Sequence, residues 1–436
     1  MHRCSLRALS RAGAVLSVLG LAVIALFCRP LVRPTPISRA AQTVTVLYSG
    51  DIDWTLLPRF AALVKAEKPD LSVIGGRFLT DGPVRYLLLG EAECQALAAS
   101  GIDAVRLTPD FLGLGLKTAR RLADSLVPPV FLLSGNVWDS SRQSLFGPAF
   151  LRRAISLPAG SLRIGLIGLA GNGSSPFWNQ PGIAWQNPDS AARHLLPVVR
   201  MSSDLVGIVS EPGAAPELTP GADFVIGSDK SPLPATSSLV NRLELGLDAQ
   251  NRVVVTRITS IDLQRLKPDS VVLALVRKLE QRADSLLDAR VNETKVELDI
   301  KALTGIALKT TSSRAHAEGA LFGNSLVLKP LGIGDISLRR LFDVTGPGNQ
   351  LLKLRIEGQE FEKFPPPGEP GVEWRSILKH QRIMLRRQYD IVATLEYVVN
   401  HPVLMSRRLD FLPLSLAEVY AFALRDRSKA KPDSLE

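Results

Sequence analysis

Short polar segments follow several apolar runs in the first half of the chain, and they carry the side chains that could do chemistry. Their acidic and basic residues include Asp51, Asp53, Arg77, Asp110, Glu211 and Asp229. In open α/β sheets, sites assemble beyond the carboxyl ends of the strands, so any chemistry is expected in these loops. Like charges placed together must be offset, either by basic side chains or by a hard cation that prefers oxygen ligands.

Histidine is scarce where these loops lie. Beyond residue 40 the chain has His194, His316, His380 and His401, and His194 alone falls in the first half. It lies within a predicted helix over 189–201 and not at the end of a strand. We therefore interpret His194 as a structural or surface residue.

The elements that must position the loops are strands and helices in alternation, which indicates an α/β fold class. Strands are expected over 44–49, 71–74, 104–107, 130–133, 162–169, 205–210 and 223–227, with helices over 56–67, 90–100, 116–125 and 189–201. A strand pair over 242–247 and 253–258 and a long helix over 268–289 are expected to end the first domain.

The length of 436 residues exceeds what one hydrophobic core usually serves, so we expect two domains behind a leader. They are predicted at 43–265 and 295–425, joined by a linker helix within 266–294. The second has strands near 351–356 and 389–395 and a loop rich in Ser and Thr around 310–314, and is interpreted as a smaller α+β domain. Residues 426–436 form a charged tail.

Residues 1–40 are typical of an export leader, with arginines on both sides of an uncharged stretch over 12–28. A cleaved signal peptide and an uncleaved membrane anchor are both compatible with that length. The expected location is therefore periplasmic or otherwise extracytoplasmic, free or anchored by residues 12–28. The leader contributes six positive charges to the net charge of +10. The rest of the chain has no cluster of Lys and Arg interleaved with aromatic residues, which argues against a nucleic-acid partner.

The loops and strands, taken in order, resemble the catalytic domain of the 5′-nucleotidase family of metallophosphoesterases. The family's Asn-Asp-x-His-Gly loop corresponds to Gly50–Trp54, which keeps the aspartate as Asp51 and has Asp53 in place of the histidine. Its Gly-Asp-Phe motif, whose aspartate bridges two metal ions, corresponds to Gly76-Arg77-Phe78.

Other motifs of the family correspond to segments that have also lost their histidines. Gly-Asn-His-Glu corresponds to Thr108-Pro109-Asp110-Phe111, the later lone histidine to Glu211, and Gly-His-x-His to Ser228-Asp229-Lys230-Ser231. Asn136 and the strand over 164–169 are retained. The resemblance therefore covers the framework of the domain more than its ligands.

The second domain resembles the family's nucleotide-recognition domain over 336–344 and 389–394, in a shorter form. The resemblance implies a four-layer α/β/β/α metallophosphoesterase-like sandwich followed by a reduced 5′-nucleotidase C-terminal-like domain. Arg314 lies where the family recognises substrate, and it is the candidate substrate-binding residue.

The chemistry of a two-metal phosphoesterase needs a bridging carboxylate, and Arg77 stands at that position. A fixed positive charge there would repel a cation. We therefore expect no metal or other cofactor, assign no catalytic residue, and interpret the six loop residues as a vestigial site. The alternative is a single Mg²⁺ or Ca²⁺ held by Asp51, Asp53, Asp110 and Asp229.

Two functions follow from these alternatives. The first is an exported, catalytically inactive or strongly altered member of the family that acts as a binding or scaffold module. Its partner would be an unknown envelope protein or a small phosphate-containing ligand, and the membrane itself if the leader is uncleaved. The second is an active phosphohydrolase acting on nucleotides or other phosphate esters through a carboxylate-rich divalent-metal site.

Overall fold

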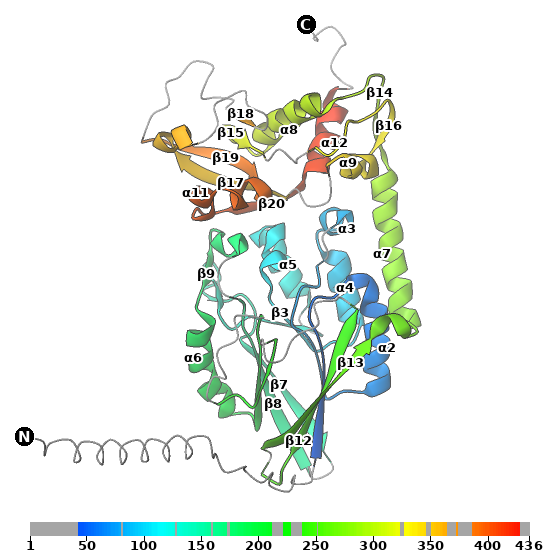
Figure 1. Cartoon of the computed structure of the whole chain (residues 1–436), viewed down its shortest axis with the longest axis vertical. Coiled ribbons are helices and arrows are strands. Elements are labelled where there is room, and N and C mark those ends of the chain that lie inside the picture. The colour runs from blue at the N-terminus through cyan, green and yellow to red at the C-terminus, as the bar shows by residue number, and fades with distance from the viewer. Residues whose placement is uncertain are drawn as a thin grey trace, which may run out of the picture.

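A computed structural model describes residues 42–79, 82–126, 129–157, 160–171, 175–211, 221–227, 238–250, 252–322, 327–345, 350–363, 372–373 and 386–427. The expected leader, residues 428–436 of the expected tail, Asp229, Lys230 and His380 lie outside these ranges, whereas the first two residues of that tail end a helix over Leu416–Arg427. The described chain forms two bodies along the long axis of the molecule, with one long helix running beside both (Figure 1).

Two stacked sheets form the centre of the first domain. The larger has the order β13-β12-β1-β2-β3-β4 and comprises Val253–Asp262, Leu239–Leu247, Gln42–Ser49, Leu71–Ile74, Ala104–Arg106 and Phe131–Leu133. The smaller has the order β11-β10-β8-β7 and comprises Phe224–Ile226, Leu205–Val209, Gly160–Gly168 and Phe150–Leu157. Strands β1 to β4 are mutually parallel, so their carboxyl ends meet at one edge of the larger sheet.

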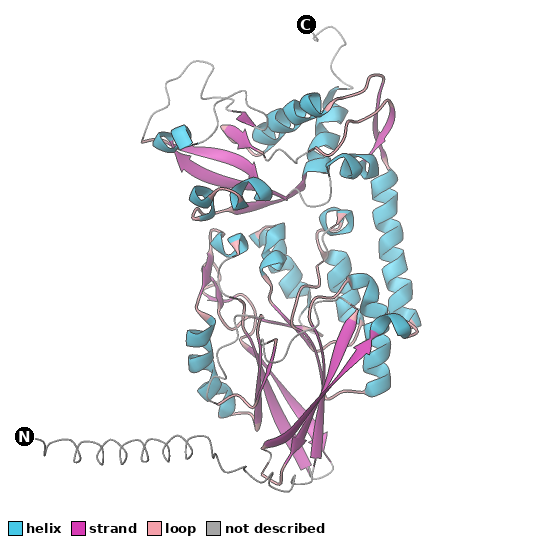
Figure 2. Cartoon of the chain, viewed as in Figure 1, coloured by secondary structure: helices cyan, strands magenta, loops and turns pink. Residues whose placement is uncertain are grey.

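The side chains of β1 point alternately to the two faces of the larger sheet, which shows how the two sheets stack. Val44, Val46 and Tyr48 face the smaller sheet and share a core with its Ile164 and Leu166, whereas Leu47 faces a layer of helices. That layer contains α2 (Leu57–Glu67), α4 (Glu91–Ala99) and α5 (Leu116–Leu126), and α6 (Pro188–Arg200) covers the outer face of the smaller sheet. The predicted four-layer sandwich is confirmed (Figure 2).

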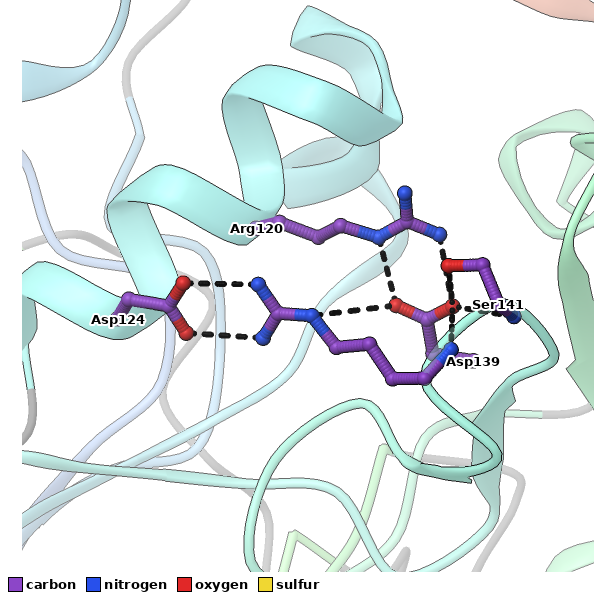
Figure 3. Close-up of polar contacts among 5 residues, drawn as sticks. Arg120, Asp124, Asp139 and Ser141 are labelled. Atoms are coloured by element: carbon purple, nitrogen blue, oxygen red, sulfur yellow. Dashed lines mark hydrogen bonds and ion pairs between the residues drawn. The ribbon is translucent and has the colours of Figure 1, made fainter.

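A third, three-stranded sheet is tied to α5 by ion pairs. It comprises β6 (Ser144–Leu145), β5 (Val137–Asp139) and β9 (Ile183–Trp185). The fully buried Asp139 accepts hydrogen bonds from Nε and Nη2 of Arg120 at 2.6 and 2.7 Å, and from the Ser141 hydroxyl at 2.8 Å (Figure 3). Arg142 extends this chain of charges to Asp124 of α5 through two bonds of 2.8 Å.

Helix α7 (Ser270–Asp288) is the predicted linker helix, and it begins at a residue suited to start it. The Asp269 carboxylate accepts hydrogen bonds from the backbone N–H groups of Val271 and Val272, which satisfies two donors of the first turn. One face of α7 is buried along its length, from Val272 to Leu287. No helix in the described part of the chain combines the length and apolar character needed to cross a bilayer.

The second domain is a five-stranded sheet between helices. Its order is β18-β15-β19-β17-β20, comprising Val372–Glu373, Gly319–Leu321, Gln388–Thr394, Gln350–Glu357 and Asp410–Ser415. One face packs on α8 (Ile300–Arg314), α9 (Leu338–Thr345) and α12 (Leu416–Arg427), and the other on α10 (Leu395–Val399) and α11 (Pro402–Met405). This is the α+β domain that the sequence predicts.

Two details of this domain differ from expectation. The Ser- and Thr-rich segment predicted as a loop is the C-terminal part of α8. Its hydroxyls are accommodated within the helix, as Ser312 donates to the carbonyl of Leu308 at 2.9 Å. In addition, β14 (Arg290–Thr294) pairs with β16 (Gly334–Ser337), so the end of the expected linker is part of the second domain.

Aromatic and polar side chains join the two domains. The rings of Phe177, in η3 (Pro176–Asn179), and Phe411, in β20, have centroids 4.7 Å apart. The Asn179 amide donates to the Met405 carbonyl at 2.8 Å, and its backbone carbonyl accepts from the Leu409 N–H at 2.9 Å. These contacts connect the loop edge of the sandwich to the sheet of the second domain.

Candidate functional site

The loops after β1 and β2 are joined by Asp51 and Arg77. The Arg77 backbone N–H donates to Oδ1 of Asp51 at 2.8 Å, and its guanidinium Nε donates to Oδ2 at 2.9 Å. A Cβ on Gly76 would lie 2.3 Å from Oδ1 of Asp51, so glycine is needed there for the carboxylate to come so close. The Asp51 carboxylate is therefore already bound to a guanidinium of the neighbouring loop.

A second arginine, Arg106, lies at the end of β3 and is 2% exposed. Its Nε donates to the Gly75 carbonyl at 2.5 Å, and its Nη1 lies 3.9 Å from Oε2 of Glu211, which follows β10 of the other sheet. Burial lowers the pKa of Arg106, and the charges of Glu211, Asp110 and Asp51 act to raise it. The charges of three predicted carboxylates thus act on one buried guanidinium.

Glu211 reaches this position because the residue facing it, Gly171, has no side chain. A Cβ on Gly171 would lie 1.8 Å from Oε2 of Glu211, closer than any real contact. The larger sheet supplies the guanidinium of Arg106 and the smaller sheet supplies the carboxylate of Glu211. They can meet only while residue 171 is glycine.

Asp110 lies in η2 (Pro109–Leu114), after β3, and is 8% exposed. Burial raises the pKa of Asp110, and the nearby guanidinium of Arg85 opposes this shift. Arg85 comes from α3 (Pro83–Leu87), is itself buried, and donates from Nη2 to the backbone carbonyl of Asp110 at 2.6 Å. The site therefore contains a third arginine.

The remaining predicted residues have other surroundings. The Asp53 carboxylate accepts from the Thr55 N–H and hydroxyl at 2.8 and 2.7 Å, which caps η1 (Trp54–Leu56). Arg314 ends α8, a helix on the side of the second domain away from the first, and its guanidinium carbon lies 4.1 Å from the ring centroid of Phe422 (Figure 1). His194 is exposed on α6, and Asp229 lies outside the described residues.

Asn136, which matches a retained residue of the family, belongs to the framework. Its amide donates to the carbonyls of Ala170 and Gln186 at 3.0 and 2.9 Å and accepts from the Ala170 N–H at 2.7 Å. All of these partners are backbone groups, so the side chain joins three loops.

The described residues do not fit the two-metal centre that the resemblance implies. Asp51 is bound to Arg77, and the charges of Asp51, Asp110 and Glu211 act on Arg106. Within the described ranges, no group of three or more His, Cys, Asp or Glu side chains is placed to hold a metal ion. Three guanidiniums, of Arg77, Arg85 and Arg106, lie near the three carboxylates, so part of the negative charge is offset within the arrangement itself.

Arg106 and Arg85 are the site residues that sequence analysis missed. The signal for Arg106 was present, since it is the one charged residue in the apolar run Ala104-Val105-Arg106-Leu107. A charge inside a strand that is otherwise buried is rare unless it is paired, and it indicates acidic groups nearby. Arg85 carries no comparable signal.

No family model and no curated protein matches the chain, but solved structures do. A putative 5′-nucleotidase from Staphylococcus aureus in complex with alpha-ketoglutarate has a TM-score of 0.58 at 13% identity, over 90% of this chain and 98% of its own. NAD nucleotidase from Haemophilus influenzae has a TM-score of 0.54 at 13% identity, over 88% and 96%. A 5′-nucleotidase precursor from Thermus thermophilus has a TM-score of 0.50 at 14% identity, over 90% and 98%. The chain therefore has the two-domain fold of the 5′-nucleotidases.

Proposed function

We propose that this protein is a catalytically inactive relative of the 5′-nucleotidases that serves as a binding or scaffold module outside the cytoplasm. The observation that carries the proposal is the position of Arg77, bound to Asp51 at 2.9 Å, where a two-metal hydrolase needs a carboxylate between its cations. The arginine-rich leader supports the location. An envelope protein or a small phosphate-containing ligand is the proposed partner.

Arg106 supports the same proposal from the other side of the site. Two divalent cations would have to enter a space where fixed guanidinium charges already neutralise Asp51 and Glu211. Bringing a cation beside a buried, permanently charged group is unfavourable, because the low dielectric of the interior strengthens the repulsion. The arginines would thus provide structurally what metal ions provide in an active enzyme, which is charge balance for the loop carboxylates.

The test is an assay of the purified full-length chain against nucleoside monophosphates and an aryl phosphate, each with Mg²⁺, Mn²⁺, Ca²⁺ or Zn²⁺. We expect hydrolysis no faster than the buffer rate, and equal rates for wild type, Asp51→Ala and the control Asp343→Ala, whose residue is exposed on α9. Calorimetric titration with the same metals should give no heat of binding.

The rival, a phosphohydrolase with a carboxylate-rich metal site, predicts the opposite results. Metal-dependent turnover that is lost in Asp51→Ala and kept in Asp343→Ala would establish the rival and remove our proposal. Saturable binding of Mg²⁺ or Ca²⁺ that Asp51→Ala abolishes would contradict the claim that the arginines have replaced the metals.

A further inference from the structure

Aspartates precede parallel strands of the first domain, at the end of the two sheets opposite the candidate site. They are Asp70 before β2, Asp103 before β3, Asp204 before β10 and Asp223 before β11. Each carboxylate accepts a hydrogen bond from one backbone N–H of the neighbouring strand, and the aspartate's own N–H donates to the carbonyl of that same neighbour. We call this arrangement an aspartate clamp.

The aspartate clamps have nearly the same geometry in both sheets. The N–H groups that donate to the carboxylates are those of Thr45, Ser72, Arg163 and Val206, at 2.8, 2.8, 2.8 and 2.7 Å in chain order. The carbonyls of the same four residues accept from the aspartate N–H groups at 2.9, 3.1, 2.8 and 2.8 Å. One device is therefore repeated at the start of successive strands.

The strands themselves do little to choose their register. β2 has four residues and β10 has five, and every one of them is buried and uncharged. A strand that is apolar on both faces has no alternation to fix its pairing, although a slip of one residue would exchange its faces. The aspartate clamps supply the missing signal, because they fix which residue of the neighbour lies beside the start of the strand.

The register of a clamped pair decides which site residues meet at its other end. In β1 and β2 it places Asp51 beside Arg77, and in β8 and β10 it places Glu211 against Gly171. The parallel strands β3 and β4 have Val130 in place of the aspartate, and the loop that follows β4 is uncharged. The aspartate clamps therefore occur where a strand pair leads to the candidate site.

We propose that Asp70 and Asp204 are positioning residues of the candidate site and act on it from the opposite end of the sheets. Each fixes the register of one strand pair, and that register fixes the contact between the two loops that follow. Because β2 and β10 are short, a shift at one end is carried to the other. This inference rests on the contacts of the site and not on whether the site binds metal or hydrolyses a substrate.

Hydrogen exchange at two N–H groups reports the two strand pairs separately. The Nε–H of Arg106 donates at 2.5 Å to the carbonyl of Gly75, which follows β2. The backbone N–H of Leu169, which follows β8, donates at 2.8 Å to the carbonyl of Val209, the last residue of β10. Both exchange rates are measured by NMR on the folded full-length chain. Unfolding of the whole domain speeds up both, whereas loss of register in one pair should speed up one.

The two alanine variants should give a crossed result. Asp70→Ala should accelerate exchange of the Arg106 Nε–H about tenfold, which corresponds to the loss of one hydrogen bond, and leave that of the Leu169 N–H nearly unchanged. Asp204→Ala should do the reverse. Asp70→Asn and Asp204→Asn should behave like wild type, because the amide oxygen still accepts the bond from the neighbouring strand.

Asp248→Ala is the matched control. The Asp248 carboxylate also accepts from backbone N–H groups, those of Gln250 and Arg252 at 2.9 Å each, and it lies at the same end of the larger sheet. It belongs to the turn between β12 and β13, which lead to no residue of the candidate site. Asp248→Ala should therefore leave both exchange rates unchanged.

Three results would overturn the proposal. Equal acceleration of both N–H groups in Asp70→Ala or Asp204→Ala would mean that the aspartate contributes only to the stability of the domain. Acceleration of neither would mean that the strand ladders alone hold the site together. An effect of Asp248→Ala as large as that of Asp70→Ala would remove the link to the clamped pairs. If Asp70→Ala does not fold, Asp204→Ala still decides, because its two rates are expected to separate on their own.

Discussion

Asp110 is buried beside Arg85, and burial is the larger influence on its carboxyl, raising its pKa. The sign for stability follows from proton linkage. The folded state holds the Asp110 proton to higher pH than the unfolded state, so this residue makes the protein less stable as pH rises from about 4, the ordinary carboxyl range, through its raised pKa. Asp110→Asn should therefore be more stable than wild type at pH 7, by on the order of 1 kcal/mol, and nearly equal to it at pH 4.

Urea unfolding at both pH values checks this prediction, with Asp51→Asn as the matched variant. Asp51 pairs with an exposed part of Arg77, so its loss should lower stability at pH 7 by about 1 kcal/mol or less. If Asp110→Asn is instead destabilising at pH 7, the attraction between Asp110 and the arginines outweighs the cost of its burial.

The sequence allows the position of a site residue to be predicted where the order of strands in the sheets is enough to place it. Asp51, Arg77 and Asp110 follow parallel neighbouring strands, and Glu211 follows a strand of the other sheet, so their convergence needs no side-chain detail. The role of Arg106 was not predictable in that way. It depends on the direction of one long side chain and on a carbonyl of the preceding loop, at Gly75, which accepts its hydrogen bond.

At the scale of elements, strands and helices with a clear period were predicted and the Ser- and Thr-rich end of α8 was not. Thr and Ser favour caps and turns because their hydroxyls can bond to nearby backbone groups. In α8 they bond to helical carbonyls one turn back, as Thr304 does to Ile300 and Ser312 to Leu308. The burial of Ile306 and Leu308 in the core then decides for a helix, and that tertiary contribution is invisible in local composition.

The contact between α5 and β5 gives a prediction at this scale. Asp139 is fully buried, and although burial opposes ionisation, hydrogen bonds from Arg120 and Ser141 hold the pKa of Asp139 below its ordinary value. Asp139→Ala leaves Arg120 without its carboxylate and should cost about 3 kcal/mol at pH 7. Asp124→Ala, in the exposed pair with Arg142, should cost about 1 kcal/mol or less.

Acid unfolding tests the same contact. Because the pKa of Asp139 is lowered in the folded state, its contribution is fully present above about pH 4, the unfolded value, and is lost as pH falls through the folded pKa. Urea midpoints of wild type and Asp139→Ala should therefore converge only below about pH 4. Midpoints that already agree at pH 7 would show that the pair contributes nothing.

At the scale of the whole molecule, two kinds of contact set the domains relative to each other. One is direct, through the rings of Phe177 and Phe411 and the hydrogen bonds of Asn179. The other runs through α7. Near the C-terminal end of this helix, Asp284 and Asp288 pair with Arg339 of α9 at 2.7 and 2.6 Å. At its N-terminal end, the capping residue Asp269 pairs with Lys65 of α2. A helix held at both ends by different domains couples their unfolding.

We therefore expect the wild type to unfold in one calorimetric transition, and the double variant Phe177→Ala, Arg339→Ala to unfold in two. Each change removes a contact between the domains, and neither removes a fully buried side chain, since Phe177 only packs against the edge of both cores. The coupling should therefore fall by roughly 1–3 kcal/mol, and the calorimetric enthalpy should exceed the van't Hoff enthalpy. Arg163→Ala removes an exposed ion pair with Asp204 inside the first domain and should keep a single transition. If the double variant also keeps one, the coupling resides in the buried face of α7, since Val272 and Leu287 at its two ends pack into the same continuous core.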